Sequence, residues 1–211
     1  MRLVSLLALL PTAAAAHPHV FVDATVEVLI EAGAVAGVRL TWTYDDLFSL
    51  MLTEDLEIDG DGDLALTETE IAALQASVTD WPPDYDGDLV VELGDVPLPL
   101  GAPEDHSVAF EGGAVVETHL RPLVEPALTT TEPIVVKVFD PYYYVAYTIT
   151  DAAVTGDPAC AATLVRADQE AAQAEVDATW AGIDWANAAP DVQLPPIGEP
   201  FSDRVEVRCG G

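Results

Sequence analysis

The sequence has little positive charge. Seven Lys and Arg residues stand against 37 Asp and Glu, which gives a formal net charge of −30 at pH 7. Nucleic acids and anionic lipid surfaces repel such a chain, so both are poor partners for it. Two interpretations of the charge stay open: a solubility adaptation of an exported, salt-exposed protein, or a means of gathering hard cations such as Ca²⁺.

Long hydrophobic runs are missing beyond the N-terminus, which argues against a membrane-spanning helix in the rest of the chain. The N-terminus carries Arg2, an apolar run at 3–10 and small residues at 13–16, which is the layout of a secretory signal peptide. We expect residues 1–16 to be removed by cleavage after Ala16. Residues 17–211 would then form one β-rich domain in the periplasm.

Cysteine is scarce, since Cys160 and Cys209 are the only two. Because an exported protein folds in an oxidising compartment, the pair is predicted to form one disulfide. On the chain-entropy model, closing a loop of about 50 residues stabilises the fold by roughly 4 kcal/mol. A redox or metal-binding role for the pair is the less favoured alternative, because the CxxC spacing is absent.

Catalytic signatures are also missing. The sequence contains no GxSxG, HExxH or Walker motif, and its few serines lack a nearby histidine. These absences leave hydrolase and nucleotide-binding functions without support. We therefore expect a binding protein that is not an enzyme.

Alternating apolar and polar residues predict strands. The apolar even positions from Val20 to Ile30 and the run from Ala36 to Tyr44 have opposite phases, which indicates a hairpin. Further strands are expected at 89–93, 108–110, 114–120, 134–139, 143–149 and 204–208. The predicted fold class is mainly β with α insertions (α+β): a β-sandwich-like body with an EF-hand-like helix-loop-helix insertion at about 45–80 and a C-terminal helix at 167–183.

The insertion contains an acidic loop at 59–70. Its residues fill positions one, three, five, nine and twelve of an EF-hand loop with Asp59, Asp61, Asp63, Thr67 and Glu70. This ligand set predicts a Ca²⁺ site. Position six, where the turn normally requires glycine, is Leu64, and a left-handed leucine costs on the order of 1 kcal/mol or more. The alternative is a solvated acidic turn between two helices.

A second candidate metal site is the expected mature terminus, His17-Pro18-His19. Its free α-amine and two imidazoles suit Ni²⁺, Co²⁺, Zn²⁺ or Cu²⁺. Two histidines at i and i+2 entering a strand point to the same face. The alternative is a frayed terminus. His106 and His119 are the other histidines; each alone is more often a surface or hydrogen-bonded residue, but either completes a site if the fold brings it near.

Five segments in order resemble one known family. They are AHPHVFVD at 16–23, TWTYDDLFS at 41–49, the loop at 59–70, VFDPYYYVA at 138–146 and FSDRVEVRC at 201–209. Together they are similar to the uncharacterised periplasmic proteins called domain of unknown function 1007. That family is often labelled the periplasmic component of an ABC-type transport system.

The resemblance implies a metal-handling accessory, because members are commonly encoded beside nickel/cobalt or zinc transporters. The family's His-Pro-His falls on His17 and His19, and its Trp-x-Phe-Asp on Trp42, Tyr44 and Asp45. The leading hypothesis is a periplasmic protein that captures Ni²⁺, Co²⁺ or Zn²⁺ through the two histidines, with Asp45 as a further ligand, for a transporter in the inner membrane. The alternatives are a calcium-stabilised interaction module and an exported copper enzyme that uses the N-terminal amine and imidazole.

Overall fold

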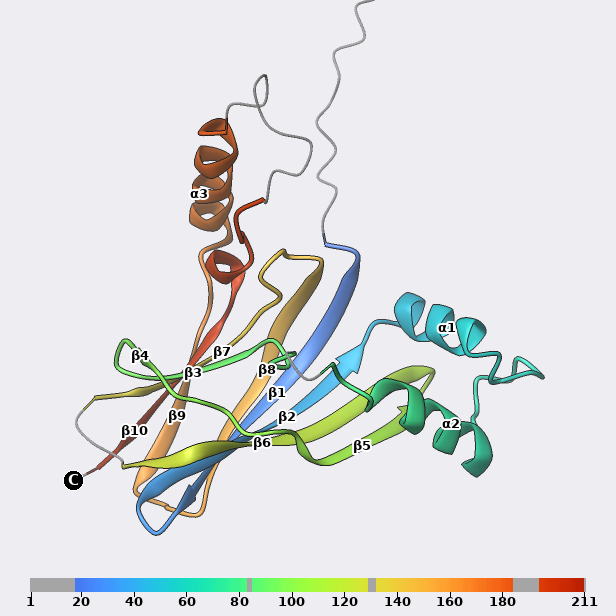
Figure 1. The fold of residues 1–211 in the computed structure, drawn as a ribbon, viewed down its shortest axis with the longest axis horizontal. Coiled ribbons are helices and arrows are strands. Elements are labelled where there is room, and N and C mark those ends of the chain that lie inside the picture. Colours follow the sequence, from blue (N-terminus) through green and yellow to red (C-terminus); the bar gives the residue numbers. More distant parts are fainter. Residues whose placement is uncertain (1–17, 83–84, 129–131, 184–193, 211) are drawn as a thin grey trace, which may run out of the picture.

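The computed structural model describes residues 18–82, 85–128, 132–183 and 194–210 (Figure 1). The expected signal peptide and His17 lie outside these residues. In the described part, ten strands form two five-stranded sheets, and three α-helices extend from them. The predicted mainly β, α+β fold class is confirmed.

The first sheet has the strand order β5-β6-β2-β1-β8. Its strands are β1 (Val20–Glu31), β2 (Ala34–Tyr44), β5 (Glu104–Glu111), β6 (Ala114–Leu128) and β8 (Val145–Thr155). β1 and β8 are parallel, and the other neighbours are antiparallel. The predicted β1–β2 hairpin is confirmed; it turns through Ala32 and Gly33, which both have positive φ angles.

The second sheet has the order β4-β3-β7-β10-β9, with antiparallel neighbours throughout. Its strands are β3 (Leu89–Leu93), β4 (Val96–Pro97), β7 (Ile134–Val138), β9 (Cys160–Val165) and β10 (Arg204–Cys209). Cys160 and Cys209 are register partners on β9 and β10 and form the predicted disulfide. Strands β4 and β9 were not predicted from the sequence.

The main hydrophobic core lies between the two sheets. One cluster of buried residues draws on β1, β2 and β8 of the first sheet and on β3, β7 and β10 of the second. The apolar even positions of β1, from Val20 to Ile30, all face this core, as their period of two requires. Each fully buried Val, Leu or Ile side chain contributes about 1.5 to 3 kcal/mol of hydrophobic free energy.

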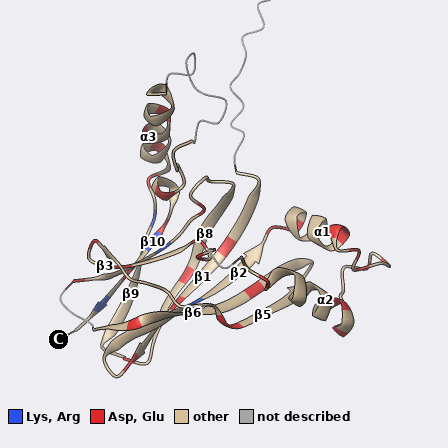
Figure 2. Cartoon of the chain, in the orientation of Figure 1, with Lys and Arg blue, Asp and Glu red and all other residues tan. Residues whose placement is uncertain are grey.

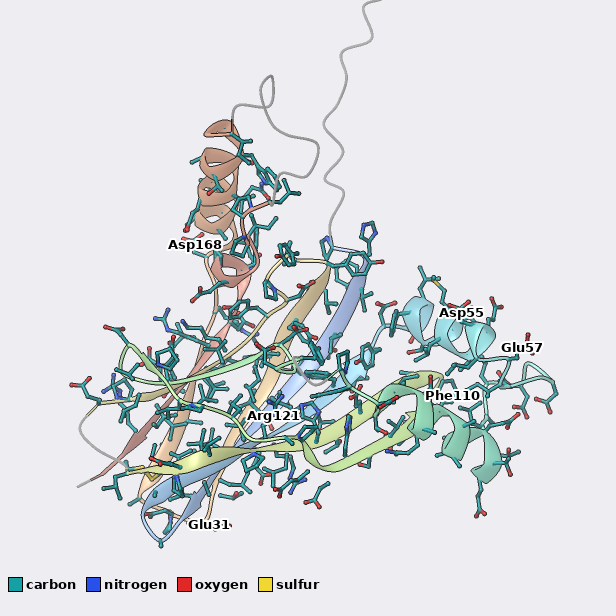
Figure 3. All side chains as sticks on the ribbon, viewed as in Figure 1. Glu31, Asp55, Glu57, Phe110, Arg121 and Asp168 are labelled. Carbon is teal, nitrogen blue, oxygen red and sulfur yellow. A yellow bond between two sulfur atoms is a disulfide. The ribbon has the colours of Figure 1, made fainter. Side chains whose placement is uncertain are left out.

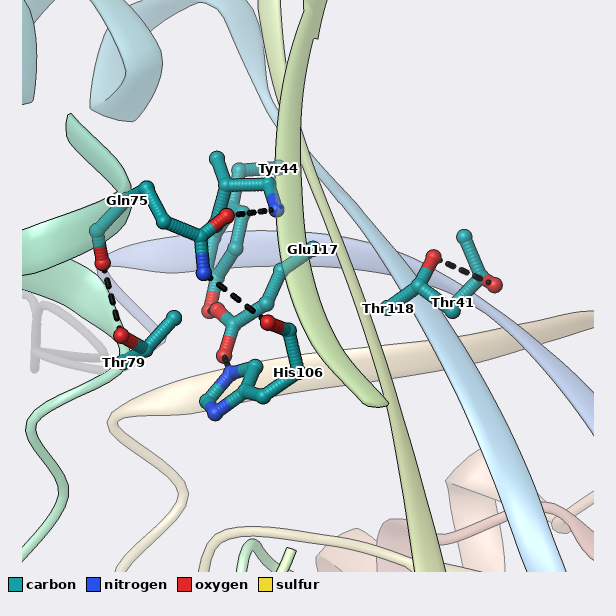
Figure 4. Close-up of polar contacts among 8 residues, drawn as sticks. Thr41, Tyr44, Gln75, Thr79, His106, Glu117 and Thr118 are labelled. Atoms are coloured by element: carbon teal, nitrogen blue, oxygen red, sulfur yellow. Dashed lines mark hydrogen bonds and ion pairs between the residues drawn. The ribbon is translucent and has the colours of Figure 1, made fainter. Parts of the chain in front are cut away.

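Helices α1 (Asp46–Asp55) and α2 (Glu68–Val78) form the predicted helical pair and lie beside β5 and β6 (Figure 1). A second, smaller core of Leu74, Val108 and Val115 joins the pair to these strands. Gln75 of α2 holds the backbone of β5: its Nε2 donates to the carbonyl of His106 (2.9 Å), and its Oε1 accepts from the amide of Val108 (2.7 Å; Figure 4).

Helix α3 (Gln169–Ala181) is the predicted C-terminal helix, and it packs against the 3-10 turn Glu199–Phe201. No helix among the described residues is long and apolar enough to cross a membrane.

Candidate metal centre

Strand β6 carries polar side chains on a face that points into the protein. Glu117, His119 and Arg121 are all buried, and they alternate with more exposed neighbours because successive side chains of a strand point to opposite faces. Apolar Val115 and Leu123 precede and follow them on the same face. Buried charged groups are uncommon unless they are paired or bind a metal.

Glu117 is bound by side chains from two neighbouring strands (Figure 4). Its Oε1 lies 2.6 Å from Nε2 of His106 on β5, and its Oε2 accepts a hydrogen bond of 2.9 Å from the hydroxyl of Tyr44 on β2. The β5–β6 register shifts between Glu104 and Ser107, and Asp105 has a φ of +49°. Such a bulge redirects side chains, and here it lies next to His106.

His119 is fully buried, and neither of its ring nitrogens has a hydrogen-bond partner among the described residues. The indole Nε1 of Trp42 is the other buried side-chain atom of the described residues in this state, and the two rings are neighbours, with centroids 4.7 Å apart. A buried polar group without a partner costs about 1 to 3 kcal/mol. Such groups in a native protein call for an explanation, of which a bound ion is one.

The three side chains His106, Glu117 and His119 converge. Each offers one ligand atom, and these atoms all lie within 4.8 Å of one another. Two imidazole nitrogens and one carboxylate oxygen form a ligand set that Zn²⁺ uses and that also suits Ni²⁺ and Co²⁺. A cation that draws these atoms together would give both charge balance and a partner for His119.

The electrostatics of the cluster favour a neutral His119. Burial, followed by the charges of His106 and Arg121, lowers the pKa of His119 to about 3. The imidazole therefore keeps a free lone pair at neutral pH, and this is the form that binds metal. Burial also raises the pKa of Glu117, although hydrogen bonds from His106 and Tyr44 act in the opposite direction.

Trp81 covers the histidines. Its ring centroid lies 4.7 Å from those of both His106 and His119, and the ring stacks on Trp42 at 5.9 Å. The guanidinium of Arg121 lies 5.9 Å from the Trp81 centroid. A surface hollow of about 350 Å³ is lined by Trp81 and Arg121, so Trp81 separates the histidines from this opening.

A second carboxylate of the polar interior, that of Asp88, is half-buried. The hydroxyls of Tyr147 (2.7 Å) and Tyr85 (3.1 Å) both donate to Oδ2 of Asp88. Burial raises the pKa of Asp88 to about 6, against the effect of these two hydrogen bonds.

The described residues of the predicted transition-metal site, His19 and Asp45, have separate structural roles. His19 is exposed where the chain enters β1, and its amide donates to the carbonyl of Tyr144 (2.9 Å). Asp45 caps α1: Oδ1 accepts from the amide of Phe48 (2.9 Å) and Oδ2 from that of Phe21 (2.8 Å). Their roles as ligands, and the copper chelate with His17, stay predictions.

The acidic loop has several features of the predicted calcium site. Ligand atoms of Asp59, Asp61 and Asp63 lie within 4.8 Å of one another, and Leu64 has a φ of +59°, the left-handed conformation that position six requires. Oε2 of Glu70 accepts bonds from the amide (2.8 Å) and hydroxyl (2.7 Å) of Thr67, the N-cap of α2. Calcium binding by the loop stays a prediction.

From the sequence, His106 and His119 were candidates only as separate residues, and Glu117, Trp81 and Arg121 were not predicted. One signal was available: on a strand at 114–120, Glu117 and His119 share the face of apolar Val115, which places both inside the protein.

A protein-family model described as "Protein of unknown function (DUF1007)" matches residues 2–209 of the chain. No curated protein and no solved structure matches it.

Proposed function

The chain belongs to the DUF1007 family of proteins of unknown function, and we propose that it binds a divalent transition-metal ion through His106, Glu117 and His119. The proposal rests on one observation above all. His119 is buried with two unpartnered nitrogens beside a second imidazole and a carboxylate. The unpartnered nitrogens of His119 cost free energy in the ion-free protein. A metal ion that accepts a nitrogen lone pair would remove part of this cost.

Zn²⁺, Co²⁺ and Ni²⁺ are the ions that this site suits. All three bind imidazole and carboxylate, and three protein ligands leave a fourth position of a tetrahedral ion open. The Nε1–H of Trp42 is a donor and cannot bind a cation. An exogenous acceptor in the open position, such as water or a small anion, would give that indole its partner.

Capture and delivery is the role proposed for this site, and catalysis is not part of the proposal. The signal-peptide pattern and the family resemblance support a periplasmic accessory of a Ni²⁺, Co²⁺ or Zn²⁺ transporter in the inner membrane. His17 and His19 would form an outer point of capture, and the centre under Trp81 would hold the ion.

Metal titration of single variants tests the proposal. Calorimetry with Zn²⁺, and visible absorption with Co²⁺ as a spectroscopic probe, are expected to show one tight site in the metal-depleted protein. His119→Phe should lower the Zn²⁺ affinity of this site by more than about tenfold. Mutation of a residue that only hydrogen-bonds to a metal ligand already lowers affinity by about that factor. His19→Ala is the matched control, because it removes an exposed imidazole outside the centre.

Unfolding curves of each variant without metal separate loss of binding from loss of the fold. Unchanged Zn²⁺ and Co²⁺ affinity in a folded His119→Phe variant would refute the site. Loss of the tight site in His19→Ala alone would move the function to the N-terminus.

A further inference from the structure

Helix α1 packs only part of its apolar surface against the protein: Phe48 and Leu52 are half-buried and contact the two cores, and the other apolar residues face outward. Its buried residues are Ser49 and Thr53, whereas Leu47, Leu50 and Met51 are 65%, 42% and 52% exposed. A surface helix normally buries its apolar stripe against the core and presents its polar face to water.

The buried side of α1 explains why the fold does not need those apolar residues. Oγ of Ser49 accepts a hydrogen bond of 3.0 Å from the amide of Val115 on β6, and the hydroxyl of Thr53 donates to the carbonyl of Leu50 (2.9 Å). These small polar side chains let the helix lie close to the strand. The exposed Leu and Met side chains therefore lower the solubility of the protein, and they do not stabilise its fold by packing.

A fourth apolar side chain lies at the start of this helix. Phe21 of β1 is 54% exposed. Its carbonyl accepts from the amide of Asp45 (2.9 Å), and its amide donates to the carboxylate of the same residue, the N-cap of α1. We call Phe21, Leu47, Leu50 and Met51 the α1 patch. Figure 3 shows α1 extending away from the sheets, with Asp55 and Glu57 at its far end.

The surroundings of Leu47, Leu50 and Met51 in the α1 patch are acidic. The sequence has no Lys or Arg between Arg39 and Arg121, and the same stretch contains 20 Asp and Glu residues. Figure 2 shows this for α1 and α2, which carry acidic residues and no basic ones. Exposed acids lie on the patch's own elements, at Asp23, Asp46 and Glu54. Like charge opposes covering the patch with a second copy of this chain or with an anionic membrane.

We infer that the α1 patch is a docking surface for a cationic amphipathic segment of a partner protein. Leu47, Leu50 and Met51 follow the i, i+3, i+4 spacing of a helical ridge, which fits an apolar groove or the face of another helix. Lys and Arg at the rim of that segment would pair with the surrounding carboxylates. The inference is independent of the metal centre, because none of the four patch residues is a proposed ligand.

Met51 supplies a direct probe. The sequence contains two methionines, and the other is Met1 in the expected signal peptide. In the processed protein labelled with ¹³C-methyl methionine, one NMR signal would therefore report on the patch. Titration with a synthetic amphipathic helical peptide of Leu and Lys is expected to shift this signal and to give a saturable affinity that weakens at high salt. Peptides of Leu and Glu, and of Ser and Lys, should leave it unshifted.

The double variant Leu47→Gln/Leu50→Gln keeps the methionine probe and removes two apolar side chains from the ridge. It is expected to weaken binding of the Leu-Lys peptide by about tenfold or more. Val124→Gln, which changes an exposed apolar residue of β6, should bind as the parent does. Equal melting temperatures of the variants and the parent confirm that the fold is kept.

Three outcomes would overturn the inference. The first is a Ser-Lys peptide that shifts Met51 as strongly as the Leu-Lys peptide, because charge alone would then explain binding. The second is equal affinity of the double variant and the parent. The third is a parent protein that light scattering finds to be a dimer and the double variant to be a monomer, which would identify a second copy as the occupant.

Discussion

The hydroxyl of Tyr44 lies 2.9 Å from Oε2 of Glu117, so the last residue of β2 donates a hydrogen bond to the carboxylate of the candidate metal centre. Burial, followed by the charge of Glu117, raises the pKa of Tyr44 well above its ordinary value. The phenol therefore stays protonated and remains a donor at neutral pH.

Tyr44→Phe should destabilise the protein by roughly 1.5 to 3 kcal/mol, because it removes a hydrogen bond to a charged group in a buried site. Urea unfolding of the metal-free protein measures the change. Tyr142→Phe is the control: its side chain is exposed, and the expected effect is within about 0.5 kcal/mol. A Tyr44→Phe variant as stable as this control would show that the hydrogen bond contributes nothing net.

His119→Phe should separate stability from function. Phenylalanine has no polar atoms and therefore removes the two unpartnered nitrogens of His119, so the metal-free variant is expected to gain about 1 kcal/mol in unfolding free energy. Zn²⁺ should raise the melting temperature of the parent and leave that of the variant unchanged. His106→Phe is the matched comparison, and it should lose stability because Glu117 loses its 2.6 Å partner. A large destabilisation by His119→Phe would show that the imidazole already has hydrogen-bond partners in the metal-free protein.

Asp88 should make stability depend on pH between about 4 and 6. Its folded pKa of about 6 lies above the ordinary 3.8, so the folded state binds more protons than the unfolded state in this window. The unfolding free energy therefore falls as pH rises through the window and levels off above it. Asp88→Asn keeps an oxygen acceptor for Tyr85 and Tyr147 but cannot ionise. The difference between parent and variant unfolding curves should show this fall, and a constant difference from pH 4 to 7 would contradict it.

Leu64→Gly tests the acidic loop. Glycine at a φ of +59° relieves a left-handed leucine that costs on the order of 1 kcal/mol, and if Ca²⁺ binding is what holds residue 64 in this conformation in solution, the affinity should rise about fivefold. Calorimetry with Ca²⁺ measures this, and a chelator should lower the melting temperature of the calcium-loaded protein. Asp61→Asn should weaken binding in the same assay. If neither Ca²⁺ nor chelator changes the melting temperature of the parent, the loop is a solvated turn.

The body of the fold follows from local patterns. The strict alternation from Val20 to Ile30 predicted a strand with one face in the core, and the reversed phase after Ala32-Gly33 predicted its hairpin partner. Strand β9 lacked such a signal, because Cys160-Ala-Ala-Thr has little apolar alternation; it is a strand because β10 pairs with it. Pairing between segments far apart in the chain cannot be predicted from the residues of either segment alone.

The candidate centre could be predicted from the sequence only in part, because it too depends on pairing between distant segments. Glu117 and His119 share a face by spacing alone, so two of the three ligands follow from the strand prediction. His106 joins them through the β5–β6 register and the irregularity near Asp105, which no local pattern specified. Trp81 reaches the site from the loop after α2, where the two prolines that follow it predicted only the end of a helix.

The amide of Gln75 joins the helical pair to the backbone at His106 and Val108 through one donated and one accepted bond. Any event that lifts α2 from the sheet edge must break both bonds, and it frees the segment that presents an imidazole to the interior. If lifting α2 weakens the hold on an ion bound at His106, then binding of that ion strengthens the attachment of α2 to the sheet by an equal free energy, because such coupling is reciprocal.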